Sequence, residues 1–294
     1  MANLKEVRSR ISSTIGTQQI TKAMKLVSAT KLRRATMAIT QMRPYATKLQ
    51  EILTNLSDTV DDEQLSTYFE TREINNVLII AISSDRGLCG AFNANIAKQV
   101  KTLIKGDFAE EFNNGNVTIM PFGKKAYDGF KKIEGLKFDL SAINLFQSLN
   151  SEEVFKIGEQ VLDSYRNGAF DKVLLIYNHF VNAATQIVTT ETLLPVVTTN
   201  LDEENNKKND YLFEPGKVEI LQELIPRSLK TQMYKATLDS FASEHGARMV
   251  SMDKATDNAG ELLKNLRIEY NKARQAAITN EISEIVGGAS ALEG

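Results

Sequence analysis

Apolar residues recur every three or four positions over two long stretches of this 294-residue chain, one near each end. The first stretch runs from Leu4 to about Leu56, and the second runs from about Leu221 to Ile285. Steps that alternate threes and fours are typical of a helix that packs against another helix along a seam. The pattern therefore predicts a very long helix at each end of the chain.

The predicted seam of the first helix has thirteen positions, and it is interrupted where the same phase meets Lys31 and Arg34. Pro44 predicts a kink or a local break, because proline removes a backbone donor. The seam positions are Leu4, Val7, Ile11, Ile15, Ile20, Met24, Val27, Ala38, Met42, Tyr45, Leu49, Ile52 and Leu56.

The second helix is expected to follow the stop signal Glu214-Pro215-Gly216. Pro226 predicts either its first turn or a kink just inside it, and Gly287-Gly288 is expected to loosen its end. Its predicted seam positions are Leu221, Leu224, Ile225, Leu229, Ala259, Leu263, Leu266, Tyr270, Ala273, Ala277, Ile278, Ile282 and Ile285.

The pattern changes between the two helices. Four segments rich in β-branched and aromatic residues predict strands, and amphipathic segments at 93–104 and 151–168 predict helices between them. An alternation of strand and helix indicates a Rossmann-like α/β domain with a largely parallel sheet. The predicted strands are 75–82, 116–122, 171–180 and 185–196.

The expected fold class is therefore α/β plus long helices. Neither terminal helix has a partner of matching length within the α/β part, so we expect the two to form an antiparallel coiled coil with the α/β domain inserted between them. The expected divisions are a coiled-coil helix at 1–58, an α/β foot domain at 72–200, a mobile polar loop at 201–216 and a closing helix at 217–294.

Composition limits the function classes. An apolar content of 42% is ordinary for a soluble globular protein, and no stretch approaches eighteen uncharged apolar residues, so no membrane insertion is expected. The N-terminus carries no apolar signal segment, which favours the cytosol. One cysteine and two histidines, His179 and His245, offer no metal-ligand spacing, and we expect neither a disulfide nor a metal site.

Charge is segregated although the net charge is only −2. Residues 7–50 contain nine Lys or Arg residues and no Asp or Glu. A nucleic-acid arm and a plain solvated face are two explanations, but Tyr45 is the only aromatic residue in the segment that could stack on a base. A protein partner with an acidic lining explains both the charge and the apolar seam, and we favour it over nucleic acid.

The stretch Ser83–Phe92, SSDRGLCGAF, links a predicted strand to a predicted helix and holds the only cysteine. It could cradle a phosphate or carry a nucleophile. It lacks the G-x-x-x-x-G-K-[ST] and G-x-G-x-x-G patterns, and no histidine is near it in sequence. We therefore favour a structural turn in which Gly87 and Gly90 permit a tight corner and Cys89 packs as a small apolar group.

Three long blocks together resemble the gamma subunits of bacterial F-type ATP synthases. They are VRSRISSTIGTQQITKAMKLVSATKLRRA near the start, SSDRGLCGAFN in the middle, and the stretch from ASEHGARMVSMDKATDNAGELL to NEISEIVGGASAL at the end. They cover essentially the whole chain in the right order. The resemblance is therefore far more specific than a short motif.

This resemblance implies a central-stalk rotor that couples rotation of a membrane ring of c subunits to the catalytic sites on the beta subunits. It implies no catalytic site, cofactor or metal in this chain. The implied partners are the alpha and beta subunits of the catalytic hexamer, the epsilon subunit and the c-subunit ring, at the cytoplasmic face of the bacterial inner membrane. The implied partner contacts are Met24, Lys25, Arg248, Arg274, Gln275, Thr279, Ile282 and Ile285.

Two other hypotheses remain open from the residues alone. One is a basic coiled-coil adaptor with a vestigial nucleotide-binding fold, and the other is a nucleotide-dependent enzyme that uses the α/β domain. Saturable nucleotide binding by the isolated chain would favour the enzyme, and salt-sensitive DNA binding would favour a nucleic-acid arm.

Overall fold

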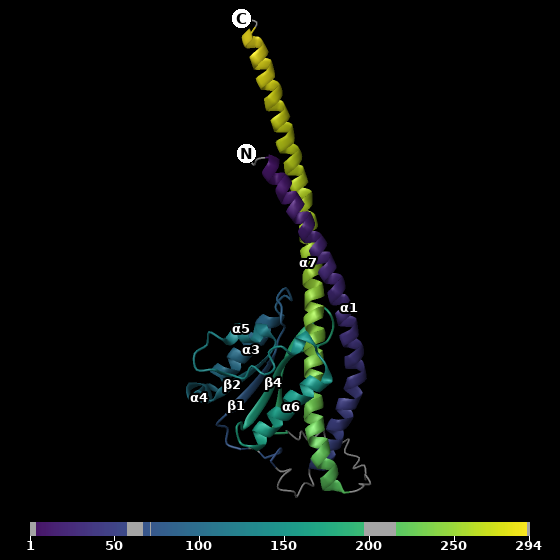
Figure 1. Ribbon diagram of the computed structural model, residues 1–294, viewed down its shortest axis with the longest axis vertical. Helices are drawn as coiled ribbons and strands as arrows, with labels where there is room; N and C mark the ends of the chain where they lie inside the picture. The colour runs from purple at the N-terminus through teal and green to yellow at the C-terminus, as the bar shows by residue number, and fades with distance from the viewer. Residues whose placement is uncertain (1–3, 58–66, 71, 197–215, 293–294) are drawn as a thin grey trace. The chain divides into compact units, whose positions relative to one another are not determined.

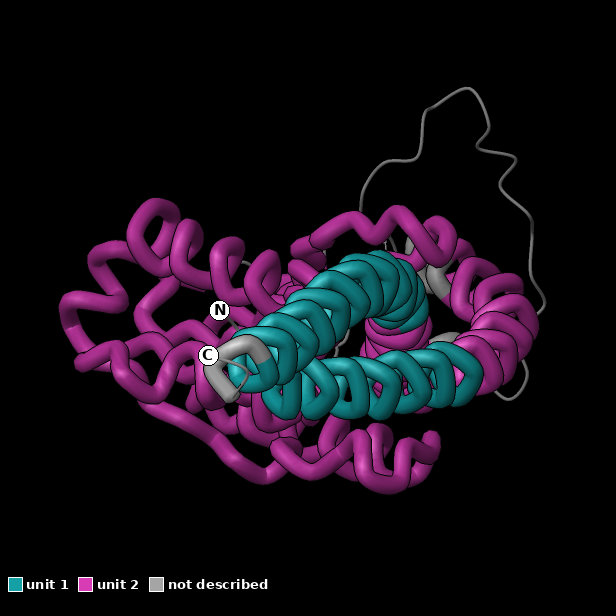
Figure 2. The backbone as a smooth tube through the Cα atoms, turned by 90° about the horizontal axis from the view of Figure 1, so that it is seen from above, with its two compact units in different colours: residues 1–28, 249–294 teal, residues 29–248 magenta. Residues whose placement is uncertain are grey.

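The computed structural model describes residues 4–57, 67–70, 72–196 and 216–292 (Figure 1). Two helices dominate it, α1 (Leu4–Ser57) and α7 (Lys217–Leu292), so the expectation of a very long helix at each end is confirmed. The chain forms two compact units, residues 1–28 with 249–294 and residues 29–248 (Figure 2). Both helices contribute to both units. The expected mobile loop at 201–216 lies, apart from Gly216, outside the described residues.

The larger unit contains a five-stranded sheet in the order β3-β2-β1-β4-β5. Its first four members run parallel, and β5 pairs antiparallel with β4, which confirms a largely parallel sheet. The central strands are buried on both faces, as their continuous apolar sequences require. The strands are β1 (Val77–Ile82), β2 (Val117–Phe122), β3 (Lys137–Phe138), β4 (Lys172–Phe180) and β5 (Gln186–Leu194).

Helices cover both faces of this sheet (Figure 1). One core joins the sheet to α3 (Phe92–Lys105) and α5 (Lys124–Phe130). The other joins it to α6 (Ser151–Arg166) and to the first turns of α7. Asn150 caps α6, because its side chain accepts a hydrogen bond from the backbone of Glu153 at 2.7 Å. The shorter elements are α4 (Ala109–Asn113) and a 3₁₀ turn at Leu145–Gln147.

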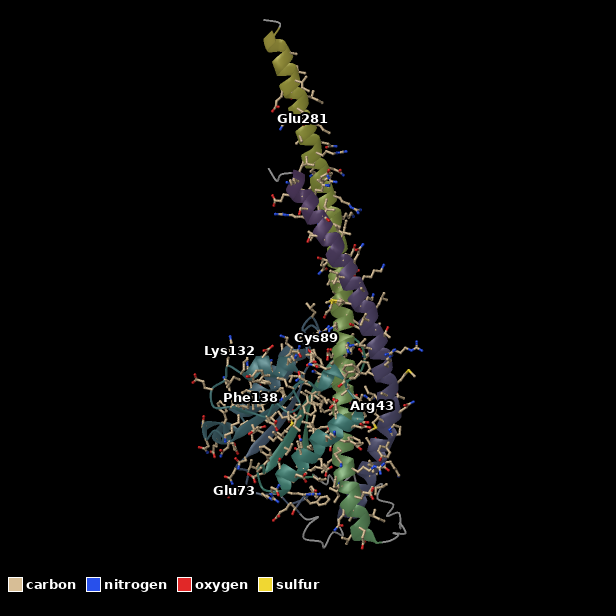
Figure 3. All side chains as sticks on the ribbon, viewed as in Figure 1. Arg43, Glu73, Cys89, Lys132, Phe138 and Glu281 are labelled. Carbon is tan, nitrogen blue, oxygen red and sulfur yellow. The ribbon has the colours of Figure 1, made fainter. Side chains whose placement is uncertain are left out.

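Within the larger unit, α1 and α7 pack through a small core of Ala35, Ile39, Leu238 and Ala242. Beside it, Arg43 donates to Asp239 at 3.0 Å and to the carbonyl oxygen of Phe180 at 3.2 Å (Figure 3). The Asp239 side chain is completely buried. A buried carboxylate needs such partners, so this ion pair fixes how the two helices meet.

In the smaller unit the seam is polar around Thr21 and Lys25, where the pattern predicted apolar residues. The hydroxyl oxygens of Thr21 and Thr256 lie 2.8 Å apart, and Lys25 pairs with Asp253. By contrast Ile20 and Val27, predicted as seam residues, are 62% and 58% exposed. That part of the prediction is wrong.

Tyr45 in the larger unit is also exposed, at 41%, against its predicted seam position. Leu221, Ile225, Leu229, Leu263 and Leu266 are buried as predicted. Ile278, Ile282 and Ile285, also predicted as seam residues, are 46%, 55% and 70% exposed. The seam prediction is therefore right for α7 as far as Leu266, and wrong for these three isoleucines and for the exposed positions of α1.

The expected local break at Pro44 is wrong, and so is the alternative that Pro226 marks the first turn of the second helix, whereas a kink at either proline stays a prediction. Pro44 and Pro226 both lie inside continuous helices. Gly287 and Gly288 do not end α7, which continues to Leu292. Pro226 and the adjacent Ile225 are both buried, so packing holds the helix at this proline.

Candidate functional site

In a parallel α/β sheet, ligands bind beyond the carboxyl ends of the strands, where the strand order reverses. Here that place lies after β1 and β4, the two central strands whose connections leave in opposite directions. β1 ends at Ile82 and runs into the stretch Ser83–Gly90, the turn that the sequence singled out. The question is therefore what occupies the space beyond β1 and β4.

The chain itself occupies it. Ser240 and Ser243 of α7 donate to the carbonyl oxygens of Ile82, at 3.4 Å, and Asn178, at 2.9 Å. The Asn178 amide donates in turn to the carbonyl oxygen of Phe92, at the start of α3. All these polar groups are buried. α7 thus packs against the carboxyl-terminal parts of β1 and β4, at the place where folds of this kind bind nucleotides.

Arg248, a turn further along α7, reaches the turn after β1. One guanidinium nitrogen donates to the carbonyl oxygens of Arg86 at 3.1 Å and Gly87 at 3.4 Å, and the other donates to Glu244 at 2.6 Å. The Arg248 side chain is 9% exposed. Its fork geometry allows these donations from one planar group.

The base of the turn is held by side chains that follow β1. Ser84 donates to the carbonyl oxygen of Arg86 at 2.6 Å, and its amide donates to the Asn93 side chain at 3.1 Å. The backbone of Lys124 donates to Asp85 at 3.2 Å. Gly123 has φ +92, and a Cβ there would lie 2.8 Å from the Ser83 carbonyl oxygen, so only glycine permits this close approach.

Cys89 lies inside the turn (Figure 3). It is 1% exposed, and the amide of Asn93 donates to its sulfur at 3.2 Å. Burial raises the pKa of the thiol above its usual range. The thiolate is the reactive form, so this cysteine is poorly suited to nucleophilic chemistry.

Burial also shifts the pKa values of Glu244 and His245, the two titratable residues beside Arg248. Desolvation raises the pKa of the Glu244 carboxyl, and the Arg248 guanidinium opposes that shift. Burial, followed by the Arg248 charge, lowers the pKa of His245 to about 3, so its imidazole is neutral at neutral pH. Because an arginine N–H can only donate, the proton of His245 lies on Nε2, which finds no partner within the described residues.

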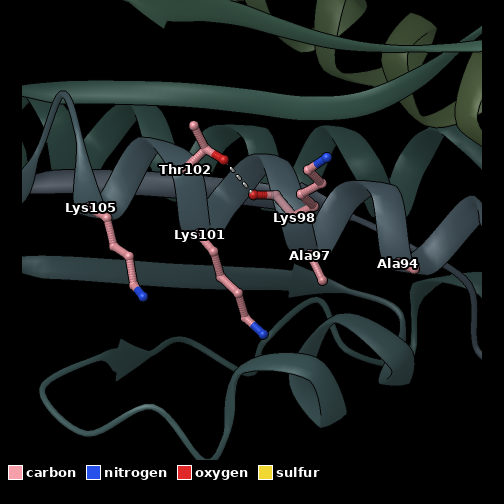
Figure 4. Close-up of a pocket in the computed structure, with 6 residues that line it drawn as sticks. All are labelled: Ala94, Ala97, Lys98, Lys101, Thr102 and Lys105. Atoms are coloured by element: carbon pink, nitrogen blue, oxygen red, sulfur yellow. Dashed lines mark hydrogen bonds between the residues drawn. The ribbon is translucent and has the colours of Figure 1, made fainter.

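A shallow groove of about 420 Å³ lies on the outer side of α3 (Figure 4). It is lined by Ala94, Ala97, Lys98, Lys101, Thr102 and Lys105, and most of these residues are exposed. α3 contains no acidic residue. The groove is a basic surface on a helix flank and does not resemble an enclosed, largely apolar ligand pocket.

Two further observations bear on chemistry. Within the described residues, no three His, Cys, Asp or Glu side chains are grouped so that they could hold a metal ion. Among the described helices, none has a stretch apolar and uncharged enough to cross a membrane.

The predicted partner contacts fall into two groups. Most are accessible: Met24 and Lys25 are partly exposed, and five residues of α7 are exposed where Glu281 is labelled in Figure 3. Arg248 differs, because its guanidinium is used inside the chain. The five exposed residues are Arg274, Gln275, Thr279, Ile282 and Ile285.

Sequence reasoning missed two features. One is the buried Asp239, which accepts from Arg43 and lies 3.2 Å from His179 Nδ1. The sequence signal that could have revealed Asp239 is a single acidic residue among small residues of α7, because residues 7–50 of α1 are basic and carry no acid of their own. The other is Leu88, which is 64% exposed and has φ +64, a left-handed conformation that leucine rarely adopts. Nothing in the composition of the turn marks it.

Fold and site together define a class: a protein whose terminal helices form an antiparallel coiled coil and whose inserted α/β domain has its ligand position filled by its own helix. The ATP synthase family model matches residues 3–292. The ATP synthase gamma chain of Christiangramia forsetii is 54% identical over 100% of both chains, and that of Flavobacterium johnsoniae is 53% identical over 100% of both. The chain belongs to the gamma-chain family of ATP synthases, and the resemblance seen in the sequence is confirmed.

Solved structures similar to this chain also come from ATP synthases. A chain of the central stalk and c-ring of Tetrahymena thermophila mitochondrial ATP synthase is 27% identical with a TM-score of 0.56, over 80% of this chain and 99% of that one. A chain of the Euglena gracilis mitochondrial ATP synthase rotor is 21% identical with a TM-score of 0.66, over 94% and 98%. The second likeness shows the fold alone, and the fold is that of a central stalk.

Proposed function

We propose that this chain is the non-catalytic rotor of a proton-translocating ATP synthase, and that it transmits rotation of a membrane ring to the catalytic sites of other subunits. The observation that carries the proposal is that α7 occupies the place beyond β1 and β4 where folds of this kind bind nucleotides. Ser240 and Ser243 donate to backbone carbonyl oxygens of the two strands, and Arg248 donates to the turn after β1. Cys89, the one candidate nucleophile in the turn, is buried with a raised pKa.

A stalk of this kind works by presenting different faces to identical neighbours. α1 is basic over residues 7–50, whereas exposed isoleucines and valine gather on α7 from Ile278 to Val286. A ligand or partner shifts a conformational equilibrium only by its differential affinity for the two states. Catalytic subunits that meet different faces of the stalk are therefore biased toward different conformations.

The proposed partners are the alpha and beta subunits of the catalytic hexamer, the epsilon subunit and the c-subunit ring. The similar structures support the hexamer and the ring, because one is a central stalk with its c-ring and another is an F1 with its c-ring. The epsilon contact rests on the sequence resemblance. We place the complex at the cytoplasmic face of the bacterial inner membrane, with this chain bound peripherally.

The proposed ring contacts are the accessible residues named above. Arg274 and Gln275 are adjacent on α7, and Thr279 follows about one turn later, all beyond the seam residue Leu266. Met24 and Lys25 lie on α1, and Lys25 is held by Asp253. Their exposure leaves their outer faces accessible to a partner.

The test is to purify the complex from cells that produce this chain with an affinity tag, and to measure ATP hydrolysis together with ATP-driven proton pumping in membrane vesicles. We expect the catalytic hexamer to co-purify and pumping to depend on this chain. The isolated chain, assayed alone, is expected to hydrolyse no ATP. Saturable nucleotide turnover by the pure chain would contradict the proposal, as would a chain that purifies without a hexamer.

A further inference from the structure

Asparagine is directly followed by glycine at two places in the chain, Asn114-Gly115 after α4 and Asn167-Gly168 after α6 (Figure 1). Asparagine is a chemically labile residue, and a following glycine makes it more so. Glycine has no side chain to hinder the approach of its backbone nitrogen to the asparagine side-chain carbon. Both asparagines are exposed, so water reaches them. The two pairs can therefore be compared as sites of chemical modification.

The two pairs have the same local geometry. Asn114 has φ −78 and ψ −4, Asn167 has φ −77 and ψ 3, and each caps the C-terminal end of its helix. The glycines that follow have positive φ, +71 at Gly115 and +73 at Gly168. Both ends are Schellman motifs, in which the glycine amide donates to the carbonyl oxygen three residues earlier, at 3.0 Å after α4 and 3.1 Å after α6.

This geometry blocks the reaction as long as the helix end is intact. The glycine nitrogen must lose its proton before it attacks, and in both motifs that proton is bonded to a carbonyl oxygen. The nitrogen must also turn about the Cα–C bond of the asparagine until it faces Cγ, which takes it out of the motif. Each pair therefore reacts only when its helix end opens, and its rate follows the free energy of that opening.

The two helix ends differ in how they are anchored. α4 has 5 residues and none of them is buried. Phe112, whose carbonyl oxygen accepts from the glycine amide, is only partly buried. α6 has 16 residues and a side-chain cap from Asn150, and the corresponding acceptor residue, Tyr165, is 0% exposed. Opening the end of α6 disturbs a buried side chain, so it costs more than opening the end of α4.

We propose that Asn114 is a site of spontaneous covalent modification: the pair Asn114-Gly115 closes to a succinimide, which water opens to aspartate or isoaspartate, whereas Asn167 is preserved. The Gly115 nitrogen gives its proton to water and bonds to Cγ of Asn114, and the Cγ–Nδ2 bond breaks as ammonia leaves with a proton. Water then adds to one of the two ring carbonyls and breaks its bond to nitrogen. One water is consumed, one ammonia is released, and nothing is oxidised or reduced.

The products weaken the motif in which they form. Either one adds a carboxylate at the C-terminal end of α4, a helix that already carries Glu110 and Glu111, and negative charge is unfavourable at that end. In isoaspartate the backbone also runs through the former side chain, which shifts the amides that follow. One residue later, the carbonyl oxygen of Asn116 accepts from the amide of Val77 at 3.0 Å. The modification therefore loosens the place where β1 and β2 begin.

The test is to age the full chain in neutral buffer and to follow both pairs in the same sample by proteolysis and tandem mass spectrometry that separates asparagine, aspartate and isoaspartate. Asn114 should convert at least roughly tenfold faster than Asn167. In urea, where both helices are unfolded, the two rates should agree within about twofold. Equal rates in the folded chain would overturn the proposal. So would a folded chain that keeps Asn114 intact while the unfolded chain converts it.

Phe112→Ala tests whether the end of α4 controls the rate. It should accelerate conversion of Asn114 at least about threefold and leave Asn167 unchanged, because the helix end loses its partly buried side chain. Phe138→Ala removes another partly buried phenylalanine from the same core and should change neither rate. An unchanged rate in Phe112→Ala, or equal acceleration in both variants, would overturn this control by α4. If Phe112→Ala does not fold, the ratio of the two rates in wild type still decides the proposal.

Hydrogen exchange of the Val77 amide measures the consequence. Exchange should be at least about threefold faster in the aged chain than in the fresh chain, since its acceptor follows the modified residue. Asn114→Gln is the control, because its longer side chain cannot close the five-membered ring, and it should keep the fresh rate after the same ageing. Equal exchange in aged and fresh wild type, with Asn114 converted, would overturn the loosening of β1 and β2.

Discussion

At the scale of single residues, His245 shows how burial fixes a charge state. It is 5% exposed, packs edge-on against Phe241 with ring centroids 4.5 Å apart, and lies beside the Arg248 guanidinium. Protonation would place a second cation next to a buried one. The imidazole therefore stays neutral while the same histidine in the unfolded chain titrates near its ordinary pKa.

This difference predicts a pH dependence of stability. The pKa of His245 is lowered to about 3 in the folded chain, so between pH 6.5 and 3 the unfolded state binds the proton and the folded state does not. Stability from this group is present above the unfolded pKa and is lost as pH falls, by at most about 1.4 kcal/mol per unit. We expect His245→Gln to lack this slope.

The measurement is urea unfolding of both proteins from pH 7.5 to pH 5. All other titratable groups, among them His179 and Glu244, are present in both proteins, so the difference between the two pH profiles isolates His245. At pH 5 the wild type should have lost up to about 2 kcal/mol relative to the variant. Parallel profiles would show that His245 takes up its proton in the folded state.

At the scale of elements, the seam of the smaller unit explains which expectations failed. Thr21 donates to the carbonyl oxygen of Gln18 at 3.0 Å and Ser28 to that of Met24 at 2.8 Å. A small hydroxyl that bonds its own helix can occupy a buried seam position at little cost. A search for apolar positions does not detect a threonine or a serine on the seam. It therefore predicted Ile20 and Val27 as seam residues instead.

The same reasoning explains what the sequence predicted well. β-branched runs identified β1, β2, β4 and β5, because each of these strands has six or nine residues, enough to show a β-branched run. β3 has two residues, too few to show the alternation of apolar and polar positions that identifies a strand. The pairing of Arg43 with Asp239 joins residues far apart in sequence, and the exposure of Leu88 depends on a backbone angle, so neither could be read from local pattern.

The polar seam gives a second prediction. Replacing both Thr21 and Thr256 by valine should stabilise the chain by about 1 kcal/mol, because two paired hydroxyls become methyl groups of similar shape, buried at Thr21 and half-buried at Thr256. Either single substitution should gain less. Thermal unfolding of the four proteins of the cycle measures this, and a destabilised double variant would show that the hydroxyl pair specifies the seam.

The C-terminal end of α7 gives a third prediction. Thr21 faces Thr256 and Lys25 faces Asp253, and continued to Leu4 this antiparallel register ends close to Arg274. Residues 278–289 are all exposed. Deleting residues 287–294 should therefore leave the melting temperature of the isolated chain within about 2 °C of wild type.

In the complex, the same truncation should reduce thermal stability while assembly and rotation-linked ATP hydrolysis are retained. The deleted part carries one large apolar side chain, Leu292, whose full burial against a partner is worth about 1.5–3 kcal/mol. Calorimetry of the purified complex together with the pumping assay measures both. A truncated chain that never assembles would show that this end is required for docking.

At the scale of the whole molecule, the proposed function requires that the chain turns as a rotor and performs no chemistry itself. The α/β domain keeps the strand order of a nucleotide-binding fold, but α7 bonds its strand ends through Ser240, Ser243 and Arg248. The relatives that share the fold include a central stalk and a rotor. Function in this family then lies in surfaces and in their motion relative to neighbours.

The most direct measurement is rotation of this chain in a single complex. Lys132 is exposed on the α/β domain (Figure 3), and Cys89 is buried, so Lys132→Cys provides a selective attachment point for a bead while the catalytic hexamer is fixed to glass. The account predicts that adding ATP drives continuous rotation of the bead in one direction, and that rotation stops when ATP is removed. Steady ATP hydrolysis by an intact complex whose labelled chain never turns would contradict it.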